Sequence, residues 1–219
     1  MILLLQSLIM LFFAASPAYQ DTSPQKVYEE KAEKILREAS EEIKSHESLY
    51  IRFDFIVTNT EPDLQEQTDA WLYTKGDKYF MKVGYNQFIS DGVTVWSFLE
   101  EVNEVHISMA EDAGETITPT SLLENFTADF RSKWIREERD GDKNVHIIDL
   151  VPNEPHAFFK YRVAIDDLSR QIRYTEAYDR QGGTYRYEIT AFDPNPEIPE
   201  NQFFFDPDQY PGIEVVDLR

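Results

Sequence analysis

The side chains that could perform catalysis stand apart from one another in this sequence. The histidines lie on a predicted helix end, two predicted strands and a loop, without the i, i+4 spacing of a helical metal site: His46, His106, His146 and His156. Ser90-Asp91-Gly92 separates two predicted strands, whereas a nucleophile elbow separates a strand from a helix. The carboxylate pairs Glu100-Glu101 and Asp166-Asp167 point to opposite sides of a strand or into solvent at a turn. We therefore expect a binding protein with no catalytic residues, no metal site and no cofactor.

Aromatic side chains are the positive signal, with 15 Phe, 12 Tyr and 3 Trp among 219 residues. Many of them occupy segments with the alternating pattern of half-buried strands. Two interpretations fit this set: a barrel core filled by its own rings, or the wall of a cavity that holds an apolar ligand. Two predicted helices with apolar faces favour a covered cavity, because a helix across an open barrel end can act as a lid.

The stretch from Ala70 to Leu99 must position many of these rings, and its pattern predicts four short strands. Turns at 75–78 and 90–93 join them in pairs, because Gly and Asp tolerate positive φ. Seven further strands are predicted at 49–58, 104–109, 131–138, 144–151, 158–165, 171–178 and 184–192. Residues 193–196 end this series, which leaves 202–205 and a tail strand near 213–217. The connections are too short for parallel crossovers. We predict a mainly β fold with an α lid: an incomplete antiparallel β-barrel of about 11 strands, closed by short helices.

Two helices are predicted to cover this sheet. Thr22-Ser23-Pro24 combines a hydroxyl cap with Pro at the first helical position, and predicts a helix to about Lys44. Leu36 and Ile43 belong to its single apolar stripe, so one face packs on an apolar surface. Thr118-Pro119 repeats the start signal and predicts a short helix that carries Leu122, Leu123 and Phe126.

Charge and composition restrict the function further. The 41 acidic and 21 basic residues give a formal net charge of −20, which argues against binding to nucleic acid or to anionic headgroups and predicts a soluble monomer. No cysteine is present, which excludes disulfides and thiol chemistry.

An apolar run that ends in Ser16-Pro17-Ala18 predicts a signal peptide, residues 1–18, cleaved after Ala18. The alternative, a membrane anchor, requires a longer run of about 18 to 20 apolar residues. Residues 19–219 then form a single exported domain.

Several features follow the order of landmarks in the LolA family, the periplasmic carriers of outer-membrane lipoproteins, and the chain resembles that family from about Ala32 to Arg219. The segments that carry the resemblance are Trp71-Leu72-Tyr73, the SDGxTxW run from Ser90 to Trp96, the Thr118-Pro119 helix start and Phe203-Phe204-Phe205-Asp206-Pro207. The resemblance implies an incomplete β-barrel whose apolar cavity takes the acyl chains of a lipoprotein beneath a helical lid.

Site residues follow from this resemblance. The expected wall of the acyl-chain cavity consists of Phe53, Phe55, Trp71, Tyr73, Tyr79, Met81, Phe88, Trp96, Phe159, Tyr161 and Val163. The expected lid consists of Leu36, Ile43, Leu122, Leu123 and Phe126. The family's charged latch position falls on Lys75, where well-described members have an Arg that tethers the lid.

The resulting hypothesis is a non-enzymatic periplasmic chaperone of LolA type. It implies acylated lipoproteins as cargo, an inner-membrane ABC lipoprotein-release transporter as donor and an outer-membrane acceptor, with only transient membrane contact. One alternative is an envelope protein that binds or senses another lipid or apolar ligand on the same fold. A second alternative is a purely structural barrel, packed solid by its own side chains.

Overall fold

A computed structural model describes residues 23–59, 65–111, 123 and 126–219 of the chain. The predicted signal peptide, Leu122 and the predicted start of the second helix lie outside these residues. The helices are α1 (Pro24–Lys44), η1 (Glu100–Val102), α2 (Phe126–Asp129), η3 (Glu200–Phe203) and η4 (Pro207–Gln209). The strands are β1 (Ser48–Thr58), β2 (Gln65–Lys75), β3 (Lys78–Val83), β4 (Asn86–Ser90), β5 (Thr94–Leu99), β6 (Glu104–Met109), β7 (Phe130–Asp140), β8 (Lys143–Pro152), β9 (Phe158–Asp166), β10 (Ile172–Asp179), β11 (Thr184–Pro194) and β12 (Glu214–Asp217).

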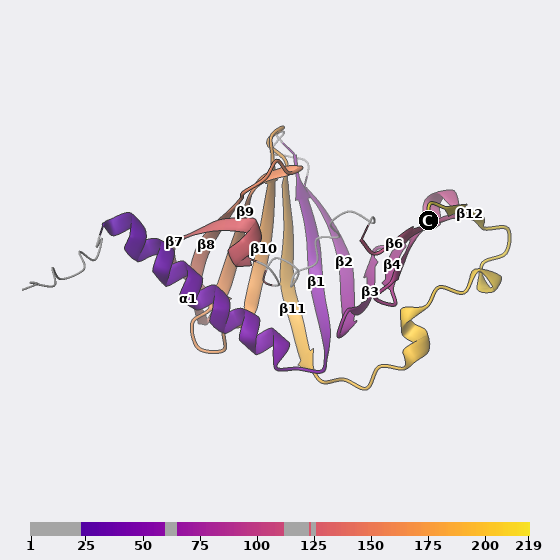
Figure 1. Cartoon of the computed structure of the whole chain (residues 1–219), viewed down its shortest axis with the longest axis horizontal. Helices are drawn as coiled ribbons and strands as arrows, with labels where there is room; N and C mark the ends of the chain where they lie inside the picture. The colour runs from indigo at the N-terminus through magenta and orange to yellow at the C-terminus, as the bar shows by residue number, and fades with distance from the viewer. Residues whose placement is uncertain (1–22, 60–64, 112–122, 124–125) are drawn as a thin grey trace, which may run out of the picture.

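All of these strands form one 12-stranded sheet in the order β12-β6-β5-β4-β3-β2-β1-β11-β10-β9-β8-β7. Neighbouring strands are antiparallel, with the exception of β12, which runs parallel to β6. The edge strands β12 and β7 lie at opposite ends of this order, so the curved sheet stays open (Figure 1). The prediction of an incomplete, mainly antiparallel β-barrel with few helices is confirmed.

Helix α1 lies across one face of the sheet, in front of β7 to β10 (Figure 1). Ser23 caps its first turn by accepting a hydrogen bond from the backbone N–H of Lys26 at 3.4 Å. The buried residues of α1 recur every three or four positions and form one stripe: Ala32, Ile35, Leu36, Ala39 and Ser40. This stripe shares a core with the sheet, and we call the side of the sheet that it packs against the inner face.

Strand alternation gives the inner face its apolar side chains. On β1, Leu49, Ile51 and Phe53 are buried, whereas Arg52 between them is exposed. The inner core extends from α1 across seven strands and includes Leu72, Met81, Ile148, Leu150, Tyr161, Val163, Ile165, Ala177 and Ile189. Leu123 and Phe126 join it from the segment around α2.

A second core lies on the opposite, outer face, over β3 to β6. It contains Ile89, Trp96, Phe98 and Val105, and is completed by Phe205. Phe205 belongs to residues 195–213, which run from the end of β11 to β12 and which we call the C-terminal strap (Figure 1). The strap therefore covers the apolar outer face of β3 to β6, as α1 covers part of the inner face.

Two features of this C-terminal region differ from the antiparallel meander. Glu200 to Phe203, which follow its last strand, form the 3-10 helix η3. Pro199 and Pro207 flank this segment, and a proline has no N–H to contribute to a strand ladder. The tail strand exists as β12, but it pairs parallel to β6, because the strap carries the chain around before it rejoins the sheet.

Loss of the Phe205 ring is expected to uncouple the strap from the sheet. Phe205 is 2% exposed and its ring centroid lies 5.5 Å from that of Phe98, whereas neighbouring Phe204 is 57% exposed. Phe205→Ala should lower the free energy of unfolding by about 3 kcal/mol, within the usual range for a buried Phe. Phe204→Ala, the matched control, should lower it by less than about 1 kcal/mol. Urea denaturation measures both, and equal losses would contradict the assignment of Phe205 to the core.

Candidate functional site

The inner face combines a buried, mostly aliphatic core with a group of partly buried aromatic rings. The rings that pack against the inner core are Phe55, Tyr79, Phe88, Phe130, Trp134, Phe158, Tyr185, Tyr187 and Phe192. They come from β1 and β11, near the middle of the sheet order, and from β3, β4, β9 and the edge strand β7 on either side.

Tyr187 lies at the centre of this aromatic group. Its ring centroid is 5.6 Å from that of Phe53 and 5.0 Å from that of Phe55. Burial among these apolar neighbours raises the pKa of the Tyr187 phenol to about 12. The phenol therefore stays neutral, and this part of the inner face presents an uncharged, poorly hydrated surface.

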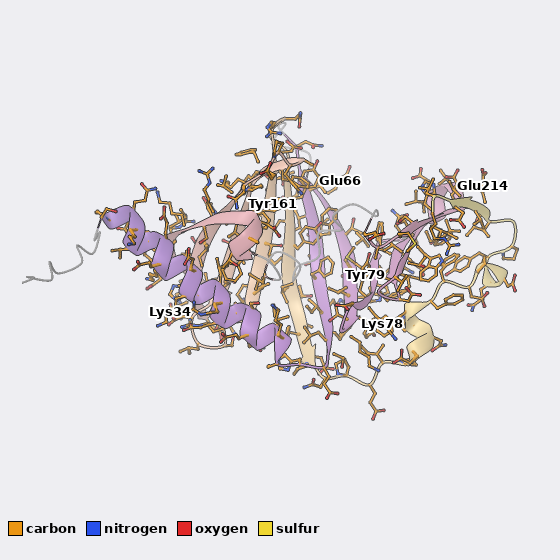
Figure 2. All side chains as sticks on the ribbon, viewed as in Figure 1. Lys34, Glu66, Lys78, Tyr79, Tyr161 and Glu214 are labelled. Atoms are coloured by element: carbon orange, nitrogen blue, oxygen red, sulfur yellow. The ribbon has the colours of Figure 1, made fainter. Side chains whose placement is uncertain are left out.

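Two hydroxyl anchors fix the rings next to Phe158. Tyr161 Oη lies 2.7 Å from Nδ1 of His156, and Tyr185 Oη donates to Oδ2 of Asp179 at 3.1 Å. The Phe158 centroid lies 5.7 Å from that of Tyr161 and 5.2 Å from that of Tyr185. Both tyrosines thus keep an apolar ring on the inner face and a polar tip held by a neighbouring side chain. Figure 2 shows Tyr161 and Tyr79 in place on their strands.

The structure brings together most of the residues expected at the cavity and the lid. Phe53, Met81, Tyr161 and Val163 are buried in the inner core, and Phe55, Tyr79 and Phe88 pack against it. The lid residues Leu36, Leu123 and Phe126 belong to the same core, and Ile43 lies at its margin. Leu122 lies outside the described residues.

Three of the expected wall residues, Trp71, Tyr73 and Trp96, lie on the outer face instead. Cross-strand pairing joins Leu72 to Met81 and Met81 to Phe88, and this row is the one that faces inward. The neighbours of Leu72 on β2 consequently face outward. The Trp71 ring lies 5.5 Å from Nζ of Lys82, and Tyr73 packs 4.8 Å from Tyr50. Trp96 belongs to the outer core under the strap.

Phe159 is also displaced from the inner face, by an irregularity in strand pairing. Tyr178 pairs with Lys160, but the next residue, Asp179, pairs with Phe158. The extra residue on β9 is Phe159, which is 44% exposed and packs beside Tyr178. Phe158 therefore takes the inner position that sequence reasoning assigned to Phe159. Tyr185 and Tyr187 were missed as well, although their alternation with Ile189 on β11 carried the signal.

Lys75 lies at the β2–β3 turn and contacts the C-terminal strap. Its Nζ lies 2.7 Å from Oε1 of Glu200, and Nζ of Lys78 lies 2.6 Å from the other oxygen. These hydrogen bonds to Lys75 and Lys78 lower the pKa of Glu200 to about 2. Figure 2 shows Lys78 beside η3, so both lysines fasten the strap to the β2–β3 hairpin.

Within residues 23–59, 65–111, 123 and 126–219, no group of three or more His, Asp or Glu side chains is arranged to hold a metal ion. No helix in this described part of the chain is long and apolar enough to cross a membrane.

Solved structures with a similar fold are distant in sequence. An uncharacterized conserved protein from Thermus thermophilus matches with a TM-score of 0.58 and 12% identity, covering 84% of this chain and 98% of that chain. A LolA superfamily protein from Nitrosomonas europaea matches with a TM-score of 0.45 and 12% identity, covering 80% of this chain and 97% of that one. The lipoprotein LppX from Mycobacterium tuberculosis gives a TM-score of 0.46 at 12% identity, covering 76% and 97%. Only the first of these scores exceeds 0.5, and at such identities the likeness concerns the fold alone.

Comparison of the sequence with known proteins and protein families adds to the likeness in fold. No curated protein matches the sequence. The family model described as outer membrane lipoprotein carrier protein LolA matches residues 84–206, which run from the β3–β4 turn to the middle of the C-terminal strap. This match spans more than half of the chain, and the open sheet with its helix-covered inner face agrees with it. The chain belongs to the LolA family.

Proposed function

We propose that this protein is an exported lipoprotein carrier that binds acyl chains on the inner face of its sheet. The observation that carries the proposal is the group of partly buried rings around Tyr187, which lies beside a core that α1 covers. Membership in the LolA family supports it, because the family model is that of an outer membrane lipoprotein carrier. In this proposal the protein collects lipoproteins at an inner-membrane ABC transporter and delivers them to an outer-membrane acceptor.

The energetics suit a carrier that must both hold and release its cargo. Burial of an acyl chain contributes ~0.8 kcal/mol per CH₂, so one long chain contributes roughly 10 kcal/mol. Release requires that the empty state is also stable, because a well-packed empty protein lowers the net affinity for cargo. The apolar stripe of α1, including Ile35 and Leu36, stabilises the empty state by covering the inner core.

Carrier function also requires export and a surface that does not adhere to membranes. We infer that residues 1–18 act as the export signal, which places the protein in the periplasm. The formal charge of −20 disfavours binding to anionic headgroups, so membrane contact is transient and confined to loading and delivery. No part of this role calls for catalysis, and the protein is proposed to work as a monomeric chaperone.

A charge on the inner face is expected to weaken acyl-chain binding. Phe55→Glu places a carboxylate beside Tyr187, and its desolvation should reduce the affinity for a fluorescent tripalmitoylated peptide by at least about tenfold. Phe159→Glu introduces the same charge at a 44% exposed site outside the inner core and should leave the affinity unchanged. Fluorescence titration measures both variants, and equal affinities for the two would contradict the inner face as the binding surface.

A charge at the cover is expected to impair cargo capture. Leu123 is 1% exposed within the inner core, and Leu123→Glu should prevent this segment from packing there while the strands persist. Capture of a lipoprotein from transporter-containing vesicles should fall by more than about tenfold. Circular dichroism checks that the sheet is retained, and Leu218→Glu, at a 64% exposed site, is the matched control. Normal capture by Leu123→Glu protein with an intact sheet would show that this residue is not part of a working lid.

The cargo class can be read directly from what the protein carries. Protein purified from the periplasm should release acylated peptides when its extract is examined by mass spectrometry. Recovery of free lipid without acylated peptide would instead indicate an envelope lipid-binding or sensing protein on the same fold. Absence of any lipid from freshly purified protein, together with no binding of the fluorescent lipopeptide, would favour a purely structural barrel.

A further inference from the structure

The turn between β9 and β10 contains a backbone conformation that costs energy at its residue type. Arg170 has a φ of +61°, in the left-handed region where the Cβ of an L-residue is crowded. Other turns of this sheet place glycine in the same conformation, with φ values of +58° at Gly76 and Gly84 and +61° at Gly141. An arginine at such a position indicates that its side chain has a use.

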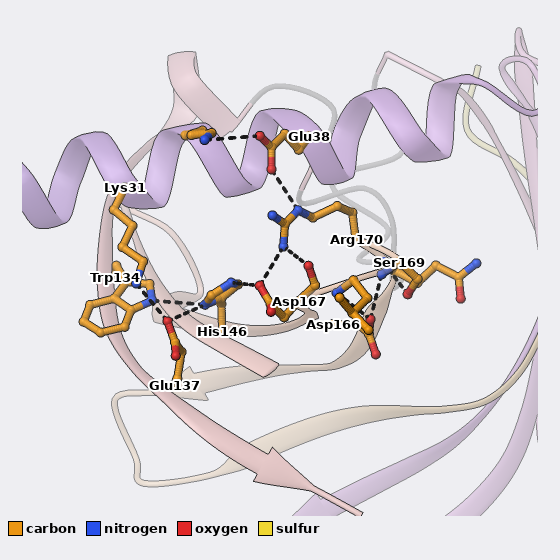
Figure 3. Close-up of polar contacts among 12 residues, drawn as sticks. Lys31, Glu38, Trp134, Glu137, His146, Asp166, Asp167, Ser169 and Arg170 are labelled. Atoms are coloured by element: carbon orange, nitrogen blue, oxygen red, sulfur yellow. Dashed lines mark hydrogen bonds and ion pairs between the residues drawn. The ribbon is translucent and has the colours of Figure 1, made fainter. Parts of the chain in front are cut away.

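The Arg170 side chain connects this turn to α1. Its Nε donates to Oε2 of Glu38 on α1 at 2.8 Å. Its Nη1 donates to the backbone carbonyl of Asp167 and lies 3.3 Å from the Asp167 carboxylate. The guanidinium is 27% exposed and Glu38 is 31% exposed, so water screens this contact only in part. Figure 3 shows the guanidinium between the helix and the turn.

Further contacts hold Asp167 in place behind the arginine. Nε2 of His146 lies 2.8 Å from Oδ1 of Asp167, and His146 is 5% exposed. The hydrogen bonds from His146 and Arg170 keep the pKa of Asp167 below its usual range, so it stays ionised. The Trp134 indole N–H can only donate, and it lies 3.5 Å from Nδ1 of His146. His146 thus lies between Trp134 and Asp167, with its Nε2 on the Asp167 side.

The chain of contacts returns to α1 two turns before Glu38. Glu137 Oε1 lies 3.5 Å from Nδ1 of His146 and 3.0 Å from Nζ of Lys31. Lys31 also lies 3.7 Å from the centroid of the Trp134 ring. The middle of α1 is thus fastened to the sheet by charged contacts at two points on one side of the helix (Figure 3).

The C-terminal end of α1 is fastened separately. The backbone N–H of Glu47 donates to Asn195 Oδ1 at 2.8 Å, and the His46 ring packs 5.9 Å from Phe192. Covalent continuity into β1 at Ser48 secures the same end. Loss of the contact at Glu38 would therefore remove one of the two charged contacts on the middle of α1 and loosen the helix around Glu38, while its C-terminal end stays attached.

We propose that Arg170 is the positioning residue that holds α1 closed over the inner face, and that loss of its contact with Glu38 opens that face to an acyl chain. We call the contact between Arg170 and Glu38 the latch. Lys75, in contrast, holds the C-terminal strap through Glu200. The nature of the ligand rests on the proposed function, whereas the closure of α1 by the latch does not.

The variant Arg170→Gly distinguishes an effect on the closure of α1 from an effect on the stability of the whole protein. Glycine adopts a φ of +61° without a Cβ, so the thermal midpoint should not fall. In the ligand-free protein, amide hydrogen exchange of residues 28–40 should nevertheless become faster by about five- to tenfold, because a partly buried charged contact is lost. If Arg170 only stabilised the fold, Arg170→Gly would lower the thermal midpoint and leave amide hydrogen exchange in α1 unchanged.

Two controls complete this experiment. Asn103→Gly relieves the same kind of strain, at a φ of +53° between η1 and β6, and should leave exchange in α1 unchanged. Glu38→Gln should reproduce the effect of Arg170→Gly on exchange, and the double variant should add little to either single change. Unchanged exchange in Arg170→Gly protein, or an additive double variant, would overturn the latch.

Lipid uptake then distinguishes the latch from the proposed function. The association rate of the fluorescent tripalmitoylated peptide should rise in Arg170→Gly protein by a factor similar to that for exchange. Faster exchange in protein that binds no lipopeptide, in wild-type or variant form, would support the latch and reject the lipoprotein carrier. Lipopeptide binding without any change in exchange would reject the latch and leave the carrier intact.

Discussion

An open sheet with apolar residues on its inner face must be covered by something, and the rest of this structure follows from that requirement. A closed barrel buries its interior by pairing its edge strands, but here β12 and β7 lie at opposite ends of the strand order. Cover for the inner face comes from α1 and from Leu123 and Phe126. The C-terminal strap covers the outer face of β3 to β6. Each cover is a separate segment, so one can move while the other stays in place.

The composition of α1 suits a cover that can be lifted. Two of its five buried residues are alanines and one is a serine, so Ile35 and Leu36 supply most of the buried apolar area. A fully buried Leu or Ile contributes about 1.5–3 kcal/mol, which leaves the attachment of this helix modest by the standard of a protein core. Charged contacts at Lys31 and Glu38 add directional strength without adding apolar area. An acyl chain can compete with such a surface, whereas it could not compete with a helix held by many large apolar side chains.

Strand positions could be predicted from this sequence far better than strand faces. Turn residues at 75–78, 90–93 and 140–142 delimit hairpins, and most strand ends fall within a few residues of the prediction. The segment Trp71-Leu72-Tyr73, in contrast, is apolar at every position, so period-two alternation does not reveal which residue points inward. Its partner Met81 decides the matter, and that pairing is a property of the folded sheet. The irregularity in the pairing of β9 with β10, which places Phe158 instead of Phe159 on the inner face, also cannot be predicted by strict alternation.

Contacts between distant segments were the least accessible to sequence reasoning, and they bear most on the site. Arg170 and Glu38 are separated by 132 positions, and Lys75 and Glu200 by 125. One sequence read by itself gives no sign that these charges meet. Lys75 was expected at the lid because the LolA resemblance places the family's charged latch at this position, but the carboxylate that it contacts in the structure belongs to the strap. The sequence likewise did not reveal that Arg170 takes a positive φ at the end of the Asp166–Arg170 turn, because the conformation of that turn is known only from the structure.

The wall and the cover of the inner face are built from different interactions, and this difference decides where motion can occur. The wall consists of hydrogen-bonded strands with interlocked rings, and the hydroxyls of Tyr161 and Tyr185 are fixed by His156 and Asp179. Displacing any of these rings would disturb several neighbours at once, because closely packed groups deform together. The cover meets the wall through one narrow stripe and a few charged contacts at its margin. Opening therefore takes place at α1, and the aromatic surface that a ligand would meet keeps its shape during the movement.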